Sequence, residues 1–335
     1  MDYKIIYYFI LLFSINFILI KFSLLIDNPK ESTHKLEKRK NTPLSGGIYL
    51  LISILIISLF KDELIFNSKF LSILFAILLL GIFSDIKSNF SPKLRIIIQL
   101  FLIILLVLIN NEMLVSRTNI NFLDLIIKNY YIKIFFTVFC IITLLNGFNF
   151  MDGVNGFVSG YNFLILLTLY LINQQTIGTY YYYDFVFVIF VFYFINTIGK
   201  CFLGDNGTYI LSILVSFLVI NTTNNNNEIS PIIAISLFWY PAIENLFTIV
   251  RRILSKKRPY LPDKLHLHSL IYRKLLINFK SFPNYTKNSL AGLILIIFLI
   301  PNFIFTYIFY NQSYLLGLIV LIYTIIYLLT YRLLS

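Results

Sequence analysis

Three aspartates stand where long apolar segments end or begin: Asp85, Asp152 and Asp205. A carboxylate beside hydrocarbon is costly unless it is paired, solvated or bound to a cation. Three carboxylates with neighbouring amides and glycines suit a hard cation such as Mg²⁺, which takes oxygen ligands and leaves positions for water and phosphate. Any one of them could instead cap a helix. Their joint placement favours one shared site.

A second polar cluster follows the first apolar segment and contains Asp27, Thr42, Pro43, Gly46 and Gly47. A glycine pair that opens a helix lets backbone N–H groups approach a phosphate closely. Thr-Pro and Gly-Gly also mark ordinary turns, so this cluster alone is a weak indication.

A third cluster is the basic stretch 251–268, which includes Arg252, Asp263, His266 and His268. A His-x-His pair can bind a transition metal. Among so many cations, a phosphate-binding loop is the better interpretation, because arginine and imidazole both donate to phosphate oxygens. The alternative is a basic loop that faces anionic lipid.

The composition excludes an ordinary soluble domain, because 59% of the residues are hydrophobic and only 13% are charged, against roughly 25% charged in soluble domains. Apolar runs of about 20 residues match a membrane-spanning helix. The run 96–109 does not alternate as a barrel strand would. The chain is therefore predicted to be an all-α polytopic bundle. The net charge of +12 is attributed to orientation signals and lipid contact, so no nucleic-acid partner is expected.

Eleven transmembrane helices are predicted in one domain that spans residues 1–335. The segments are 5–26, 45–60, 64–83, 94–110, 131–147, 157–172, 181–199, 207–221, 231–250, 289–309 and 314–332. The first is interpreted as a helix and not as a signal peptide. The stretch 111–130 is predicted to be an external loop or surface helix.

Lys and Arg gather in loops of one parity, which places those loops in the cytoplasm, the N-terminus outside and the C-terminus inside. The predicted cytoplasmic loops are about 27–44, 84–93, 148–156, 200–206 and 251–288. All three polar clusters fall on this side, so an active site on the cytoplasmic face is expected.

Five ordered motifs, each at the predicted cytoplasmic side, resemble a known family. Most weight falls on Asn-x-x-Asn-x-x-Asp-Gly at 146–153 and Gly-Asp-x-Gly at 204–207, and the last of the five is Pro-Asp-x-x-His-Leu-His at 262–268. The chain is similar over residues 27–275 to the polyprenyl-phosphate N-acetylhexosamine-1-phosphate transferases. These form the MraY/WecA superfamily, glycosyltransferase family 4, and the last motif points to the WecA-like bacterial branch.

The resemblance implies a multi-pass enzyme of the bacterial inner (plasma) membrane. It would transfer an N-acetylamino-sugar-1-phosphate from a UDP-amino sugar of the GlcNAc type to undecaprenyl phosphate, releasing UMP. The product would initiate a lipid-linked surface glycan such as O-antigen, capsule or another cell-envelope polysaccharide. The expected cofactor is Mg²⁺, with Mn²⁺ as an alternative. The expected partners are both substrates and membrane lipid, and a homodimer is compatible with the resemblance.

The resemblance also implies roles for individual residues. Asp205 and Asn149 would bind the metal, and the catalytic residues would be Asp85 and Asp152. Asp85 would position or deprotonate the lipid phosphate, or organise the metal shell. The implied substrate-binding residues are Asp27, Thr42, Pro43, Gly46, Gly47, Asn146, Asn155, Arg252, Asp263, His266 and His268.

Two positions depart from the family pattern. Ser84-Asp85 stands where the family often has Asp-Asp, and Asn155 stands where it often has a second aspartate. Either Asp85 suffices, or the protein is a catalytically degenerate relative that binds lipid or nucleotide. A membrane transporter is the other alternative, since intramembrane carboxylates also line ion pathways. Transporter sites, however, tend to lie near the midplane.

Overall fold

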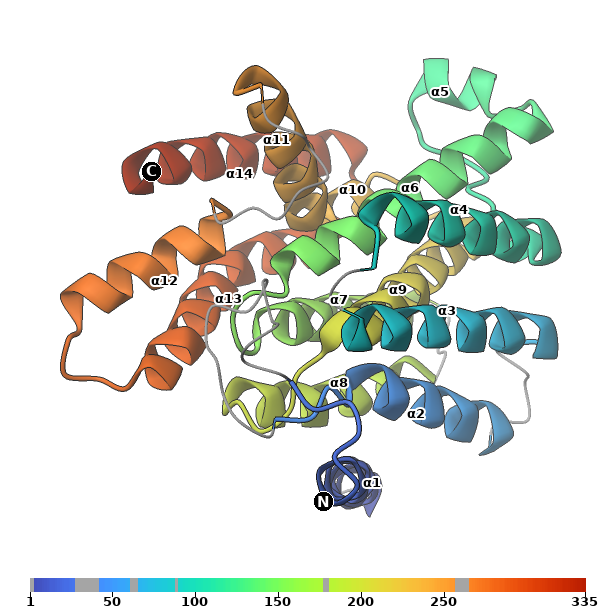
Figure 1. Cartoon of the computed structure of the whole chain (residues 1–335). Helices are drawn as coiled ribbons and strands as arrows, with labels where there is room; N and C mark the ends of the chain where they lie inside the picture. Colours follow the sequence, from blue (N-terminus) through green and yellow to red (C-terminus); the bar gives the residue numbers. More distant parts are fainter. Residues whose placement is uncertain (1–2, 28–41, 61–65, 88–89, 177–180, 257–264) are drawn as a thin grey trace.

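The computed structural model describes residues 3–27, 42–60, 66–87, 90–176, 181–256 and 265–335. Within these residues the secondary structure is helical (Figure 1), apart from an isolated β-bridge between Ile26 and Pro43. The helices are α1 (Tyr3–Lys21), α2 (Gly46–Phe60), α3 (Ser68–Ile86), α4 (Pro92–Ile109), the 3₁₀-helix η1 (Asn111–Met113), α5 (Asn121–Ile126), α6 (Tyr130–Met151), α7 (Phe157–Thr176), α8 (Tyr181–Thr197), α9 (Gly204–Asn225), α10 (Ile233–Leu237), α11 (Trp239–Leu254), α12 (Leu267–Asn278), α13 (Asn284–Ile308) and α14 (Ser313–Leu334).

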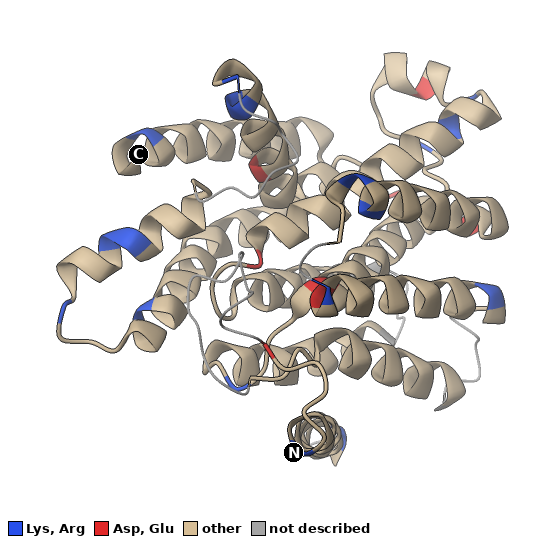
Figure 2. Cartoon of the chain, in the orientation of Figure 1, with Lys and Arg blue, Asp and Glu red and all other residues tan. Residues whose placement is uncertain are grey.

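The long helices confirm a polytopic membrane protein. Eight of the described helices are long and apolar enough to cross a bilayer, namely α1, α3, α4, α6, α7, α9, α13 and α14. Apolar stretches of α2 and α8 are shorter. Charged residues are sparse along these helices (Figure 2), as hydrocarbon requires. The number of crossings and their orientation stay predictions.

The predicted segment 231–250 is not one continuous helix. It is divided into α10 and α11 at Phe238. Pro241 has no N–H with which to bond the carbonyl of Leu237. That carbonyl instead accepts a hydrogen bond from Tyr161 Oη at 2.8 Å, and the Tyr240 N–H donates to the same hydroxyl at 3.4 Å. A buried tyrosine from α7 therefore stabilises the break.

Two predicted loops contain helices. The stretch 251–288, assigned to a loop, includes α12, which packs against α13. The stretch 111–130 includes η1 and α5, and α5 has no buried residues. The latter agrees with the expected surface helix.

Helix α9 is the central element of the bundle (Figure 1). It is buried along nearly its whole length and packs against α2, α3, α6 and α7. Some of its hydroxyl groups are satisfied within the helix; Ser212 Oγ, for example, donates to the Thr208 carbonyl at 2.6 Å. A buried central helix places its first turn, where Asp205 lies, inside the protein and not in a mobile loop.

Arg117 holds the other end of α9. Its guanidinium donates to the carbonyls of Thr223 at 3.0 Å, Asn226 at 2.6 Å and Ile229 at 2.9 Å. The Thr223 carbonyl lies in the last turn of α9, where carbonyls have no helical donors, and a cation is favourable there.

Arg117→Ala is therefore expected to destabilise the fold by about 2 kcal/mol or more, the scale of hydrogen bonds that involve a charged group. The measurement is the thermal unfolding temperature in detergent. Arg117→Lys is the matched control and should recover only part of the loss, because an ammonium lacks the planar fork of donors. An unchanged unfolding temperature in Arg117→Ala would contradict this assignment.

Candidate active site

Asp205 is the centre of a polar cluster at the start of α9. Its Oδ2 accepts hydrogen bonds from Ser84 Oγ at 2.6 Å, Arg95 Nη1 at 2.9 Å and Tyr209 Oη at 3.2 Å. Its Oδ1 accepts from Asn149 Nδ2 at 3.0 Å. The side chains of Asp205 and Arg95 are 20% and 19% exposed. The cluster is thus a partly buried ion pair, built from α3, α4, α6 and α9.

Asp85 contacts the same turn from the end of α3. Its carboxylate accepts from the backbone N–H of Asp205 at 2.9 Å and of Asn206 at 3.1 Å, and from Asn206 Nδ2 at 2.5 Å. Gly204 has φ +70°, and a Cβ there would lie 2.7 Å from Asp85 Oδ2. Asp85 therefore caps α9 from another helix and determines the orientation of Asp205.

The glycine pair at the start of α2 lies against this turn. Gly47 N–H donates to Asn206 Oδ1 at 2.6 Å, and Gly46 N–H donates to the Phe202 carbonyl at 3.3 Å. A Cβ on Gly47 would be 2.5 Å from the carbonyl oxygen of Asn206. Both N–H groups expected to meet a phosphate thus have protein acceptors, and the glycines permit close packing of α2 on α9. Their phosphate-binding role stays a prediction.

Asp27, Thr42 and Pro43 connect the preceding loop to the same region. Asp27 N–H donates to the Thr42 carbonyl at 2.9 Å, and the Pro43 carbonyl accepts from Phe202 N–H at 2.9 Å. Asp27 and Thr42 are buried. These contacts fix both ends of the loop beside the start of α9.

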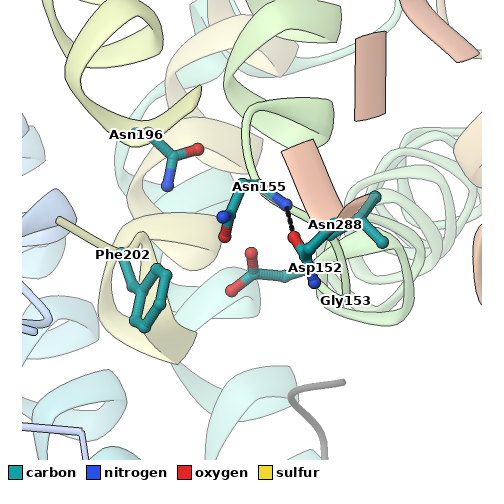
Figure 3. Close-up of a pocket in the computed structure, with 7 residues that line it drawn as sticks. Asp152, Gly153, Asn155, Asn196, Phe202 and Asn288 are labelled. Atoms are coloured by element: carbon teal, nitrogen blue, oxygen red, sulfur yellow. Dashed lines mark hydrogen bonds between the residues drawn. The ribbon is translucent and has the colours of Figure 1, made fainter. Parts of the chain in front are cut away.

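Asp152 and Asn155 line a neighbouring pocket, together with Asn196, Phe202 and Asn288. Figure 3 shows the Asp152 carboxylate pointing between Asn155 and Phe202. The Asn155 N–H donates to Asn288 Oδ1 at 2.7 Å. The pocket is thus polar and formed from three parts of the chain.

Asn196 and Asn288 were missed by the sequence analysis. Asn196 Oδ1 accepts from Gly156 N–H at 2.9 Å and from Ser159 Oγ at 2.8 Å, and its Nδ2 donates to the Cys201 carbonyl at 2.8 Å. Each of the two residues is an amide at the predicted cytoplasmic end of an apolar segment, and this position was the signal that could have identified them.

The two histidines pack directly on the 146–153 motif. The His266 ring lies 5.5 Å from that of Phe150 and 5.5 Å from that of His268, to which it is nearly parallel. His268 is buried against Gly153. Burial and the neighbouring His266 lower the pKa of His268 from 6.5 to about 3. His268 is therefore neutral at neutral pH and acts as a hydrogen-bonding or packing group.

Gly153→Ala is expected to displace His268, because a Cβ at this position would overlap its Nε2. Turnover should fall roughly tenfold or more, the effect of misplacing a group near a reacting centre. The measurement is turnover at matched membrane levels. Gly317→Ala is the control, since a Cβ there meets nothing within 4 Å. Equal turnover in both variants would exclude a requirement for this close contact.

Three further residues were predicted to bind substrate, and the structure describes the positions of two of them. Asn146 donates within its own helix, to the Ile142 carbonyl at 2.9 Å. Arg252 is buried in the last turn of α11. Asp263 lies outside the described residues.

The sequence analysis also missed Arg95, Tyr209 and Glu244. Arg95 opens the predicted segment 94–110, where a basic residue indicates orientation. Glu244 carried a clear signal, as a lone carboxylate within an apolar segment.

Both carboxylate oxygens of Asp205 accept hydrogen bonds from protein groups, Oδ2 from Ser84, Arg95 and Tyr209 and Oδ1 from Asn149 Nδ2. Mg²⁺ is commonly held by one or two carboxylates with water and substrate phosphates. An ion here would therefore have to replace one of these donors, and Asn149 would have to turn its amide oxygen toward the ion. In the described parts of the chain, no three His, Cys, Asp or Glu side chains converge as metal ligands. Any metal would need most of its ligands from water or substrate.

The fold and this cluster define a class: a polytopic membrane protein with a partly buried, charged cluster at the start of its buried central helix. A profile of glycosyl transferase family 4 matches residues 68–223, a range that includes Asp85, Asn149, Asp152 and Asp205. Over this range the chain is similar to glycosyl transferase family 4, and it is also similar to curated undecaprenyl-phosphate N-acetylglucosaminyl 1-phosphate transferases.

Three curated relatives illustrate the similarity. The undecaprenyl-phosphate alpha-N-acetylglucosaminyl 1-phosphate transferase of Salmonella typhi is 23% identical over 69% of this chain and 65% of its own length. The protein of the same name from Escherichia coli is 26% identical over 42% of this chain and 40% of its own. A probable undecaprenyl-phosphate N-acetylglucosaminyl 1-phosphate transferase of Bacillus subtilis is 28% identical over 58% and 55%. The matched region thus spans less than two thirds of each relative.

Proposed function

We propose that the protein transfers an N-acetylamino-sugar-1-phosphate from a UDP-amino sugar to undecaprenyl phosphate and releases UMP. The observation that carries this proposal is the Asp205 cluster, which brings Asp85, Arg95 and Asn149 together within the family-matched region. The relatives' names support a GlcNAc-type sugar as donor.

In this reaction an oxygen of the lipid phosphate attacks the β-phosphorus of the UDP-sugar, and the bond to the UMP oxygen breaks. Such phosphoryl transfers depend mainly on positioning and on neutralising charge. Asp205 and Asn149 would hold Mg²⁺, which when bound neutralises phosphate charge. Arg95 would supply a further fixed cation, and its bond to Asp205 keeps it in place.

Asp85 would act by orienting the first turn of α9. Its carboxylate already accepts three N–H groups from the Asp205–Asn206 segment. Among the roles considered for it, this supports the organisation of the metal shell over proton abstraction from the lipid phosphate. Asp152 and Asn155 would face the nucleotide, and His266 with His268 would meet the diphosphate or sugar.

The proposed location is the bacterial inner membrane, with the site facing the cytoplasm where UDP-sugars are made available. Loop charge supports this orientation. The product would initiate a surface glycan, such as O-antigen, capsule or another envelope polysaccharide.

The direct test is UMP release by the purified protein with Mg²⁺, undecaprenyl phosphate and a panel of UDP-amino sugars. Release that depends on both lipid phosphate and Mg²⁺ is expected with at least one donor. No release with any donor, from folded protein, would contradict the proposal and favour a degenerate relative that only binds ligands.

A further inference from the structure

A buried carboxylate lies behind the histidine cluster. Glu244 belongs to α11, and its side chain is 1% exposed. A carboxylate in such a place is costly unless donors satisfy its oxygens. Both oxygens have donors: His266 Nδ1 contacts Oε1 at 2.8 Å, and Tyr327 Oη donates to Oε2 at 3.1 Å. Three helices, α11, α14 and α12, meet through these contacts.

The contact determines which nitrogen of His266 carries a proton. An ionised carboxylate can only accept hydrogen bonds, so Nδ1 must be protonated to bond it. This holds whether the ring is neutral or cationic. In the neutral ring, Nε2 is then the acceptor, and in the cationic ring it is a second donor. Either way, Nε2 is the nitrogen left for a ligand.

Aromatic contacts hold the same ring in orientation. Phe150 lies at 5.5 Å on a tilted plane, and His268 lies at 5.5 Å on a nearly parallel plane. Phe150 directly follows Asn149, whose amide bonds Asp205. The His266 ring therefore packs on a residue of α6 that is adjacent in sequence to a member of the Asp205 cluster.

Stability alone does not explain this carboxylate. Buried ion pairs often contribute little net free energy compared with apolar residues of similar size. What the arrangement does provide is a defined ring tautomer and orientation, as carboxylate partners do for histidines at metal sites.

We propose that Glu244 is a positioning residue for His266: it holds the proton on Nδ1 and thereby presents Nε2 to the diphosphate or sugar of the bound donor. The assignment of the ligand rests on the proposed function. The assignment of the tautomer rests on the Glu244–His266 contact alone.

The first experiment measures the tautomer in the unmodified protein. The chain has only three histidines, so ¹⁵N labelling of the imidazoles gives a simple solid-state NMR spectrum in lipid bilayers. His266→Gln identifies the signals of His266. We expect a neutral or cationic ring with a protonated Nδ1. A neutral His266 with its proton on Nε2 would overturn the proposal without any Glu244 variant.

The second experiment uses Glu244→Gln, whose amide can either accept from or donate to Nδ1. The spectrum should then show a mixture of tautomers, and kcat/KM for the UDP-sugar should fall roughly 10- to 100-fold, the scale of lost carboxylate partners of histidine ligands. Asp184→Asn is the matched control, a carboxylate that is 5% exposed and paired with Lys4 instead. It should change neither the His266 signals nor kcat/KM.

The outcomes separate the two proposals. An unchanged tautomer and unchanged kcat/KM in Glu244→Gln would overturn the positioning role. If the unmodified protein turns over no donor, the proposed function fails, while the ¹⁵N spectra still decide what Glu244 does to His266.

Discussion

Asp205→Asn is expected to lower UMP release by at least roughly 10²-fold while the protein remains folded, since metal or charge stabilisation at a phosphoryl group contributes several kcal/mol. Asp205 contacts Ser84, Arg95, Asn149 and Tyr209 at once. The amide keeps the shape of the side chain but removes its charge. It therefore weakens any Mg²⁺ site and leaves Arg95 without its partner carboxylate.

The measurement is turnover at saturating Mg²⁺ and matched membrane levels, together with Mn²⁺ binding followed by electron paramagnetic resonance. Asp124→Asn is the control, a carboxylate in the exposed helix α5 that bonds Thr118. It should retain both turnover and Mn²⁺ binding. Near-normal turnover in Asp205→Asn would remove this residue from the metal site.

Much of the arrangement was predictable because hydrocarbon restricts where polar residues can lie. The apolar runs predicted the long helices, and the clusters at their ends predicted that Asp85 and Asp205 would share a site. In the structure the Asp85 carboxylate bonds the backbone of Asp205 at 2.9 Å. Segment ends of one parity are expected at one membrane face, and carboxylates gathered at one depth usually mark a shared site.

Specific partners were not predictable in this way. Arg95 and Asp205 are 110 positions apart in the chain, and nothing in either segment indicates the other. A cation at the start of a helix fits an orientation signal equally well. The helical break at Phe238 was missed for a different reason: Pro241 was visible, but a proline also occurs within continuous membrane helices when neighbours satisfy the freed carbonyl.

The glycine pair shows the limit of motif interpretation. Gly46-Gly47 is compatible with a phosphate-binding loop and with close helix packing. Each of these two roles requires a residue that has no side chain. Only the position of Asn206 distinguishes them, because its side chain accepts the Gly47 N–H. That contact depends on how α2 and α9 pack, which local sequence does not determine.

Asp85→Asn is expected to lower turnover by roughly 10²-fold, and Ser84→Ala by only roughly tenfold. The carboxylate of Asp85 accepts three N–H groups. An amide in its place turns one acceptor into a donor that faces another donor, and a buried donor without a partner costs about 1–3 kcal/mol. The start of α9 should shift, and Asp205 should shift with it.

Ser84 contributes one hydrogen bond to Asp205, at 2.6 Å, beside the stronger contact from Arg95 at 2.9 Å. Its loss leaves the ion pair and the Tyr209 contact intact, so the carboxylate should stay in place. A neutral hydroxyl also cannot replace a carboxylate as a metal ligand or base near neutral pH. The function of this motif should therefore reside in Asp85.

Both variants are to be compared for UMP release at matched membrane levels, with unfolding temperatures measured alongside. Asp85→Asn should lose far more turnover than Ser84→Ala even when both are folded, because the first shifts the start of α9 and the second removes a single hydrogen bond from it. Two results would defeat this argument. One is retention of most activity in Asp85→Asn. The other is a larger loss in Ser84→Ala, which would make the serine hydroxyl, and not the cap on α9, the group on which Asp205 depends.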